Sequence, residues 1–473
     1  MTSPHRSSDA IFSASGAHGP HVRSAPVLEN HAIHLGGTNP RKVSFWMPLA
    51  GAFTRTGIAT AIASLLLTVV MISFRPFQPG GAEMPSAGGD IVNQLGFGAL
   101  GAISIFSLFT FADRRVLMAL FAPSFLLLLG FLMLSVANAT DPMAALRAAS
   151  FTIIGILVMA TVLAIPRDAD AFSAVIAFSG IFIVVLCFVG LVLFPNEAKH
   201  TTVGAEPQHA GLWRGVFTHK NIAGPVMACF SFGGLYLFRR GWKVTGPFLL
   251  VAAMIFMMNT GSKTTAGLVP LAILMVAVPG IFGVRSLTPA LFLLAIIGTT
   301  IGTLGIVFIE PLRLFVHHNF PDLTYTGRTT LWEFAGEMIA KKPWTGYGYE
   351  SFWGTMFLWT MDQPFDRPWD IRSIVHGHNG YLDIAVIMGI PALCVAAWAF
   401  FIAPLRDYMR IPMRKENVFL GDFFMMILLF TALNSFLESF FFRRADPVWL
   451  FFVFSIIGLR LVARFPVATR TKR

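Results

Sequence analysis

Residues 289–311 read PALFLLAIIGTTIGTLGIVFIEP and contain no charged side chain before Glu310. A helix of this length covers roughly 30 Å, which is the thickness of the hydrocarbon core of a bilayer. The chain changes character after Pro311, because residues 312–379 are polar overall and contain the turn-forming run HHNFPDLTYTG at 317–327. The contrast predicts a membrane-spanning helix followed by one long polar loop.

The composition of the whole chain agrees with a membrane protein. Hydrophobic residues make up 55% of the 473 positions and charged residues 12%, whereas soluble domains carry about 25% charged residues. The net charge of +11 does not indicate a nucleic-acid partner, since the charges lie in short segments between apolar runs. The cysteines all lie inside apolar runs without CxxC spacing, which predicts no disulfide and no metal cluster: Cys187, Cys229 and Cys394.

Apolar runs long enough to span a bilayer recur about twelve times, which predicts an all-α, polytopic integral membrane protein. The expected spans are 56–74, 92–112, 116–137, 148–165, 171–194, 221–238, 245–259, 265–284, 289–310, 380–403, 420–441 and 447–464. The long loop then lies between the ninth and tenth spans.

The positive charges orient these spans. With the N-terminus inside, 21 of the 35 Lys and Arg residues fall in inner segments, and six of the other 14 lie in the long loop, which counts little. Both termini are therefore expected in the cytoplasm and the loop outside. The predicted divisions are a disordered tail (1–42), helices one to nine (43–311), a catalytic loop (312–379), helices ten to twelve (380–464) and a second tail (465–473).

The loop contains a predicted amphipathic helix in TGRTTLWEFAGEMIAKKP, with an apolar face that includes Leu331, Ala335 and Met338. Arg328 lies in its first turn, where a cation is unfavourable beside the helix dipole. Either the cation of Arg328 is slightly unfavourable there and is tolerated, or it is held there to bind an anion beside the start of the helix.

Aromatic residues are dense in the same loop. Five of the ten tryptophans lie there, and Tyr347 and Trp353 belong to the run WTGYGYESFW. An interfacial belt needs fewer rings, so stacking of these rings on sugar faces is weighed equally with membrane anchoring.

The loop closes with HGHNGYLDI, in which His376 and His378 alternate and Asn379 follows. Neutral imidazole is the usual general base near neutral pH. Two histidines alone do not make a zinc site, and the nearby acids give no third-ligand spacing, so no metal is expected. Asp383 could orient an imidazole or simply cap the helix. All seven histidines beyond the N-terminal tail fall in outer segments, which indicates that the chemistry lies on the outer face.

Two earlier outer segments add polar residues. WRGVFTHKN contains Arg214, Lys220 and Asn221, and TGSKTT contains Lys263. Membrane anchoring explains cations at such boundaries. Alternatively, Arg214, Lys220, Lys263 and Arg328 could converge around a polyanion above the membrane, as Arg and Lys do on phosphates.

These three patterns, WRGVFTHKN, GRTTLWEFAGEMIAKKPWTGYGYESFW and HGHNGYLDIAVIMGIPAL, resemble the O-antigen ligase and Wzy-type polymerase superfamily, and most closely its exopolysaccharide-polymerase branch. The similarity covers roughly residues 90–460. It implies a GT-C-like glycosyltransferase of the bacterial inner membrane that acts on the periplasmic side without cofactor or metal.

The resemblance also implies roles for individual residues. Arg328 matches the family's loop arginine, Arg214 the arginine before an earlier outer span, and His378 with Asn379 its His-Asn pair. His376 is less uniformly His, and Lys263 stands where the family often has arginine. Arg328, Arg214 and His378 are therefore the expected catalytic residues. The remaining expected contacts to substrate are Lys220, Asn221, Lys263, His376, Asn379, Tyr347 and Trp353.

The implied partners are an undecaprenyl-diphosphate-linked glycan, the growing polysaccharide and the bilayer, with a chain-length regulator and a flippase as candidates. Within this class a polymerase is favoured over a ligase by the spelling of the motifs. A flippase or other transporter is the rival from another class, but its binding residues usually lie near the membrane midplane. Ionisable residues are few inside these spans, and Glu438 is the main exception.

Overall fold

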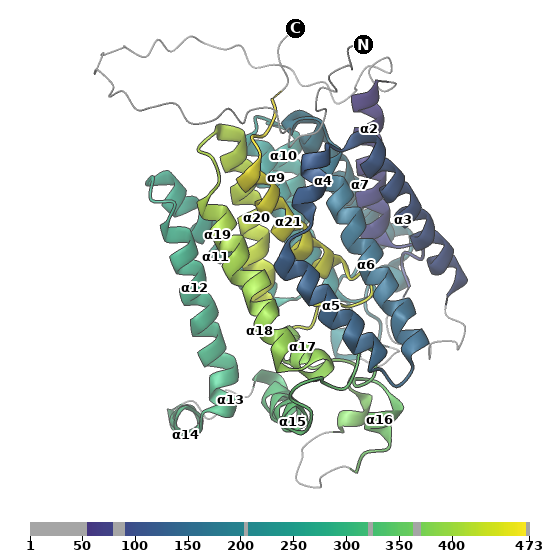
Figure 1. Ribbon diagram of the computed structural model, residues 1–473, viewed down its shortest axis with the longest axis vertical. Helices are drawn as coiled ribbons and strands as arrows, with labels where there is room; N and C mark the ends of the chain where they lie inside the picture. Colours follow the sequence, from purple (N-terminus) through teal and green to yellow (C-terminus); the bar gives the residue numbers. More distant parts are fainter. Residues whose placement is uncertain (1–53, 79–89, 203–206, 320–324, 363–369, 470–473) are drawn as a thin grey trace, which may run out of the picture.

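The protein forms an all-helical bundle (Figure 1). The computed structural model describes residues 54–78, 90–202, 207–319, 325–362 and 370–469, so the predicted N-terminal tail lies outside the described residues. In those ranges ten helices are long and apolar enough to cross a membrane. They are α2 (Arg55–Ile72), α3 (Ile91–Phe111), α6 (Pro142–Ala164), α7 (Ala169–Leu193), α9 (Lys220–Arg239), α11 (Lys263–Ile281), α12–α13 (Leu287–Phe308), α18–α19 (Ile390–Met409), α20 (Lys415–Asn434) and α21 (Pro447–Arg464).

Two further segments lie where the sequence predicts spans, but they are not single long helices. Helices α4 (Arg114–Leu120) and α5 (Pro123–Ala137) are bent by 54° where they meet, as in a broken span or a re-entrant loop, so the described residues give ten spans, or eleven with this pair. Pro123 follows the break, and a proline cannot continue the hydrogen-bond ladder of a helix. Helix α10 (Thr245–Asn259) is apolar but has only 15 residues.

Helix α10 is held tightly against α9. A Cβ atom at Gly234 would lie 2.5 Å from the Leu250 nitrogen, and one at Gly246 would lie 2.5 Å from the Phe238 nitrogen. The two backbones can therefore approach only because both residues lack a side chain, as small residues allow in membrane helices. This packing explains how a short helix is kept in the bundle.

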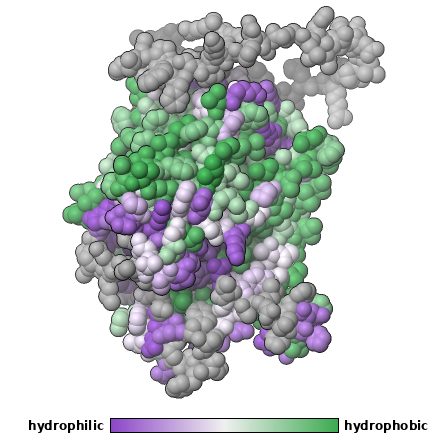
Figure 2. Space-filling model, turned by 180° about the vertical axis from the view of Figure 1, so that it is seen from behind, coloured by the Kyte–Doolittle hydropathy of each residue, from purple (hydrophilic) through white to green (hydrophobic). Residues whose placement is uncertain are grey.

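Hydrophobic residues form a broad band over the face seen in Figure 2, and hydrophilic residues gather towards its lower part. Many large apolar side chains in the band are exposed, such as Leu294 (67%) and Val251 (54%). Exposure of so large an apolar surface to water would be energetically unfavourable, so we infer that this surface faces lipid. Helices α20 and α21 lie at the centre, where the rings of Phe424 and Phe454 are 5.3 Å apart.

The bundle has two ends. The first span begins and the last span ends at one of them, which we call the terminal end; the other is called the loop end (Figure 1). The loop end carries the chain between α12–α13 and α18–α19, the seventh and eighth of the ten long helices, from Ile309 to Gly389. It contains α14 (Glu310–Asn319), α15 (Arg328–Lys341), α16 (Met356–Trp359) and α17 (Gly380–Met388).

Two predicted boundaries are wrong. The span expected at 380–403 begins ten residues later, because α17 is a separate helix that ends at Gly389. Gly389 has a φ of +84°, and its neighbour Ile390 donates a 2.7 Å hydrogen bond to the Pro343 carbonyl. The span expected at 420–441 ends at Asn434, which leaves residues 435–446 as a second connection at the loop end.

The long loop has a hydrophobic core of its own. Trp332 and Phe352 are fully buried in it, and Phe334 is only 3% exposed. These rings pack on one another, with Phe334 and Phe352 6.1 Å apart. Most aromatic residues in the described part of the loop therefore stabilise its fold, whereas Trp344 (73% exposed) and Trp359 (54%) remain on its surface.

Candidate active site

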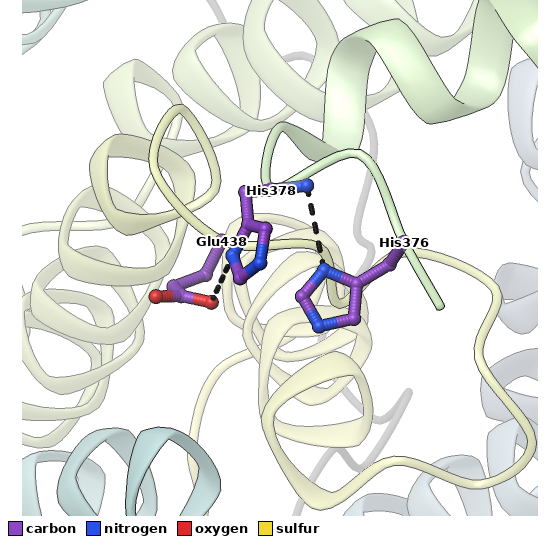
Figure 3. Close-up of side chains that lie close together, drawn as sticks. All are labelled: His376, His378 and Glu438. Atoms are coloured by element: carbon purple, nitrogen blue, oxygen red, sulfur yellow. Dashed lines mark hydrogen bonds and ion pairs between the residues drawn. The ribbon is translucent and has the colours of Figure 1, made fainter. Parts of the chain in front are cut away.

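Glu438 lies at the centre of a cluster of polar side chains at the loop end. Its Oε1 atom accepts a 2.8 Å hydrogen bond from Arg328 and a 3.1 Å hydrogen bond from the Asn221 amide. Its Oε2 atom lies 3.3 Å from Nδ1 of His378 (Figure 3). The carboxylate therefore joins three chain segments that are 60 to 217 residues away from it in sequence.

Arg328 is the first residue of helix α15, and this position brings its side chain to the Glu438 carboxylate. The helix begins directly after Gly327, whose φ of +84° is the left-handed conformation that glycine tolerates best. The position at the helix start is unfavourable for a cation, and the ion pair with Glu438 compensates for it. A guanidinium group carries five N–H donors, so one such contact is compatible with further binding of phosphate oxygens.

The HGHNG segment (376–380) is clamped from both sides. Asn379 is fully buried; its side-chain oxygen caps α17 at Tyr381 and Leu382, and its amide donates to the Phe436 carbonyl at 3.0 Å. Gly377 receives a 3.1 Å hydrogen bond from the Trp332 indole on its carbonyl.

His378 itself has a φ of +50°, an uncommon conformation for a residue with a side chain. Such strain costs on the order of 1–3 kcal/mol and is concentrated at functional sites.

Asp383 makes contacts that differ from both roles considered for it, orienting an imidazole and capping the helix, because Asn379 is the cap of α17. Its carboxylate accepts a 2.8 Å hydrogen bond from the Trp353 indole and a 3.1 Å hydrogen bond from the Gly377 backbone. Burial raises the pKa of Asp383, although these hydrogen bonds and nearby Arg443 oppose the shift. Asp383 thus fixes the backbone between the two histidines, and the carboxylate that meets an imidazole is Glu438.

The electrostatics of the cluster favour opposite charge states for its members. Burial alone would raise the pKa of Glu438, but the hydrogen bond from His378 and the charge of Arg328 outweigh it and lower that pKa. Burial, followed by the neighbouring cations, lowers the pKa of His376 well below its usual value. Glu438 is therefore an anion and His376 a neutral imidazole near neutral pH.

The start of α9 supplies the second wall of the site. His219 caps the helix through a 3.1 Å hydrogen bond from the Asn221 nitrogen, and the Lys220 nitrogen donates to Nε2 of His200 at 3.2 Å. The rings of His200, His209 and His219 lie 4.8 to 5.8 Å apart. Two of these imidazoles thus act as hydrogen-bond acceptors for the first turn of α9.

Some of the expected site residues are not brought to Glu438. Arg214 is 3% exposed and donates to the backbone carbonyls of Lys199, Gln78 and Thr218 at 3.1–3.3 Å. Burial lowers its pKa, while Glu197 opposes this effect. This placement gives Arg214 a structural role and does not support the expected contact with substrate.

The side chains of Lys263 and Lys220 are also not placed beside Glu438 by any described contact. Lys263 is exposed at the start of α11, and no described contact joins it to Glu438. Lys220 is 8% exposed, and its described contact to a histidine is made by the backbone. Of the four cations expected around a polyanion, Arg328 is the one that the described contacts place in the cluster.

The two aromatic residues expected to bind sugars are anchored inside the loop. The Tyr347 ring is 8% exposed, and its hydroxyl donates to the Met338 carbonyl at 3.2 Å. Trp353 packs on Phe352 at 4.7 Å and donates its indole hydrogen to Asp383. Tyr347 is therefore not displayed for stacking, and Trp353 is a support for the histidine segment.

Glu438 is the residue that reasoning from the sequence missed. It had been noted only as an ionisable residue in an apolar run, although such residues generally mark function. Arg443, from the same connection, was also missed; it is exposed and its charge acts on His376 and Asp383.

The protein is a bundle of apolar helices, and a cluster of arginine, histidine and glutamate side chains lies at one end of it. These features are typical of polytopic membrane proteins that have an active site at the membrane surface. Residues 226–397 match the family model described as O-Antigen ligase. This match confirms the resemblance to the O-antigen ligase and Wzy superfamily, whose members are glycosyltransferase-like enzymes that act on lipid-linked glycans. It does not distinguish the exopolysaccharide branch.

No curated protein matches the chain significantly. The matched region contains Arg328 and both histidines of the HGHNG segment, whereas Asn221 and Glu438 lie outside it. The acidic centre of the cluster is therefore a feature of the three-dimensional arrangement beyond the matched region.

Proposed function

We propose that the chain is a polymerase that joins undecaprenyl-diphosphate-linked oligosaccharide units into an exopolysaccharide, on the periplasmic side of the bacterial inner membrane. The observation that carries the proposal is the meeting of Arg328 and His378 on one carboxylate. Glycosyl transfer from a lipid diphosphate to a hydroxyl requires two groups. A fixed cation stabilises the leaving diphosphate, and an imidazole accepts the proton of the hydroxyl.

The positions of the charges support the proposed orientation. The terminal end carries Arg239, Arg285 and Arg464, and the loop end carries the cluster around Glu438. By the positive-inside rule the terminal end lies in the cytoplasm. The loop end then faces the periplasm, where a flipped carrier lipid would present its glycan.

In the proposed reaction the acceptor hydroxyl attacks the anomeric carbon of the donor. An ionised Glu438 can only accept a hydrogen bond, so Nδ1 of His378 carries the proton and Nε2 is the base that takes the hydroxyl proton. The bond between the anomeric carbon and the diphosphate oxygen breaks, and Arg328 stabilises the leaving diphosphate. Glu438 is held by Arg328, Asn221 and His378, which disfavours a covalent intermediate on it and favours inversion.

His376 and Asn379 are proposed as neighbours of this base. His376 lies with its ring 4.1 Å from that of His378, near enough to contact the acceptor, and Asn379 fixes the segment. Transfer by these residues needs no metal or other cofactor.

The alternative within the superfamily is a ligase that passes finished glycan to a lipid or protein acceptor. Lipid extracts of a strain lacking the gene test the choice. A polymerase deletion accumulates carrier lipid bearing one repeat unit, and this result is expected. Carrier lipid bearing long chains would identify a ligase instead, and repeat units trapped on the cytoplasmic side would identify a transporter.

A further inference from the structure

We propose that His376, His378 and Glu438 form a binding site for a divalent transition metal of the zinc class, and that the bound metal blocks glycosyl transfer. The three side chains offer two imidazole nitrogens and one carboxylate oxygen, all within 4.8 Å of one another (Figure 3). The blocking effect rests on the function proposed above; the binding does not.

The separations suit adjacent metal ligands as well as a long hydrogen bond. Nδ1 of His378 lies 3.3 Å from Oε2 of Glu438, at the long end of the range for N–H···O bonds. Two ligands bound to zinc at about 2.0–2.1 Å in tetrahedral geometry are roughly 3.4 Å apart. A metal ion could therefore insert between these two atoms with little movement of either.

His376 can complete the set at low cost. Its Nδ1 atom accepts from the backbone nitrogen of His378 at 3.4 Å, a long contact that contributes little. Rotation of this ring would bring its nitrogen towards the other two ligand atoms, since its ring already lies 4.1 Å from that of His378.

The surroundings match those of known metal ligands. Two histidines and one glutamate, with a fourth position left open, are a common donor set for zinc. The other oxygen of Glu438 is held by Arg328 and Asn221, as the second shell of a metal ligand usually is. The adjacent cations weaken binding, so we expect affinity on the order of 1 μM rather than that of a structural zinc site.

Metal binding and base catalysis exclude each other here. A metal bound at Nδ1 of neutral His378 requires the ring proton to move to Nε2, the atom that must accept the proton of the acceptor hydroxyl. The metal also takes the oxygen of Glu438 that orients the ring. A bound ion therefore removes the base without displacing Arg328.

The second histidine cluster provides a matched control. In His200 and His219 one ring nitrogen already accepts a hydrogen bond from the first turn of α9, at 3.2 and 3.1 Å. Metal binding through the opposite nitrogen would place a ring proton against that backbone N–H. His209, a member of this cluster, lies outside the proposed site and can be replaced as a control.

The binding test uses the purified full-length protein in detergent and Zn²⁺ alone, with titration calorimetry as the readout. We expect one saturable site per chain, a dissociation constant raised at least 10-fold in His376→Ala and in Glu438→Gln, and no change in His209→Ala. The absence of a saturable site in the wild-type protein, or unchanged binding in both site variants, would overturn the proposal.

Cobalt provides a readout that is independent of folding defects. Co²⁺ bound at this site should give a visible absorption band that Zn²⁺ removes and that is missing in His376→Ala. A His376→Ala protein with wild-type thermal stability and an unchanged cobalt band would contradict the ligand assignment.

A transfer assay separates this proposal from the proposed function. We expect chelator to leave transfer intact, micromolar Zn²⁺ to inhibit it, and excess chelator to restore it. Loss of transfer on chelation, or full transfer with zinc bound, would overturn the inhibitory role. Saturable zinc binding in a protein without any transfer activity would count against the polymerase and leave the metal site standing.

Discussion

At the scale of single residues, the decisive feature is that Glu438 holds an arginine and an imidazole together. Without its charge, Arg328 would lose its ion pair and His378 the partner that fixes its tautomer. Carboxylates that orient a metal-bound imidazole commonly contribute about 10- to 100-fold to activity, and we expect an effect of the same order for this imidazole. Glu438 is thus a positioning residue in the proposed reaction.

We expect Glu438→Gln to lower transfer roughly 10- to 100-fold while membrane abundance stays normal, because glutamine keeps the shape and loses the charge. The matched control is Glu350→Gln, which removes a similar charge from the exposed pair with Arg444 at the same end. Transfer rates from membranes with equal amounts of each protein give the comparison. Equal activity in the two variants would refute the role of Glu438.

Arg328 should not tolerate lysine. A lysine offers a point charge, whereas the diphosphate oxygens and Glu438 together need the planar fork of a guanidinium. We expect Arg328→Lys to be nearly as inactive as Arg328→Ala, and His378→Ala to abolish polymer as well. Arg372→Lys, at an exposed pair with Asp370, is the control. Full polymer output in both Arg328→Ala and His378→Ala would show that the site lies elsewhere.

Arg214 should behave as a structural residue. Replacement by glutamine removes donors from the part-buried carbonyl groups of Lys199, Gln78 and Thr218 and leaves the buried site of Arg214 without its guanidinium. We expect Arg214→Gln to lower the melting temperature and the membrane abundance, with near-normal activity per folded molecule. Normal stability with lost activity would instead return Arg214 to the catalytic group.

At the scale of elements, the sequence predicted the existence of helices better than their ends. Apolar length located the ten long helices, the bent pair α4 and α5 and the short helix α10, because lipid requires long apolar helices. It could not locate the break at Gly389 or the end of α20 at Asn434, since the residues beyond both points are also apolar. These two errors concealed α17 as a separate element and Glu438 as a loop residue.

The site was predictable in part for a similar reason. Arg328 and the histidines lie in polar segments whose sequence motifs can be identified, and Asn221 lies at the predicted start of a span. Their meeting depends on contacts across as many as 217 residues, which local pattern does not encode. The role of the aromatic run could not be predicted, because the same residue types occur in a buried core and in a sugar-binding surface.

Helix α17 depends on Asn379, which both caps the helix and donates to the Phe436 carbonyl. We expect Asn379→Ala to destabilise the protein by about 2–3 kcal/mol, from the lost cap and the unpaired carbonyl. Asn379→Ser keeps a capping oxygen and should fall between the alanine variant and the wild type. Thermal unfolding in detergent measures the series, and an alanine variant as stable as the wild type would contradict it.

At the scale of the whole molecule, the orientation in the membrane can be tested with single cysteines. In a chain whose own three cysteines are replaced, Thr360→Cys lies at the exposed surface of the loop end and Met413→Cys at the terminal end, where Met413 is 78% exposed. We expect an impermeant maleimide to label Thr360→Cys in cells with an opened outer membrane, and Met413→Cys only after the inner membrane is permeabilised. The reverse pattern would invert the proposed topology.

The connection between α20 and α21, which carries Glu438, has a consequence for biogenesis. A ribosome makes Asn221, Arg328 and His378 before Glu438, because all three precede it in the chain. Until α20 and the connection after it are inserted, Arg328 and His378 lack their shared counter-charge. A nascent chain that ends before this connection would thus have its earlier helices and the long loop but no assembled centre.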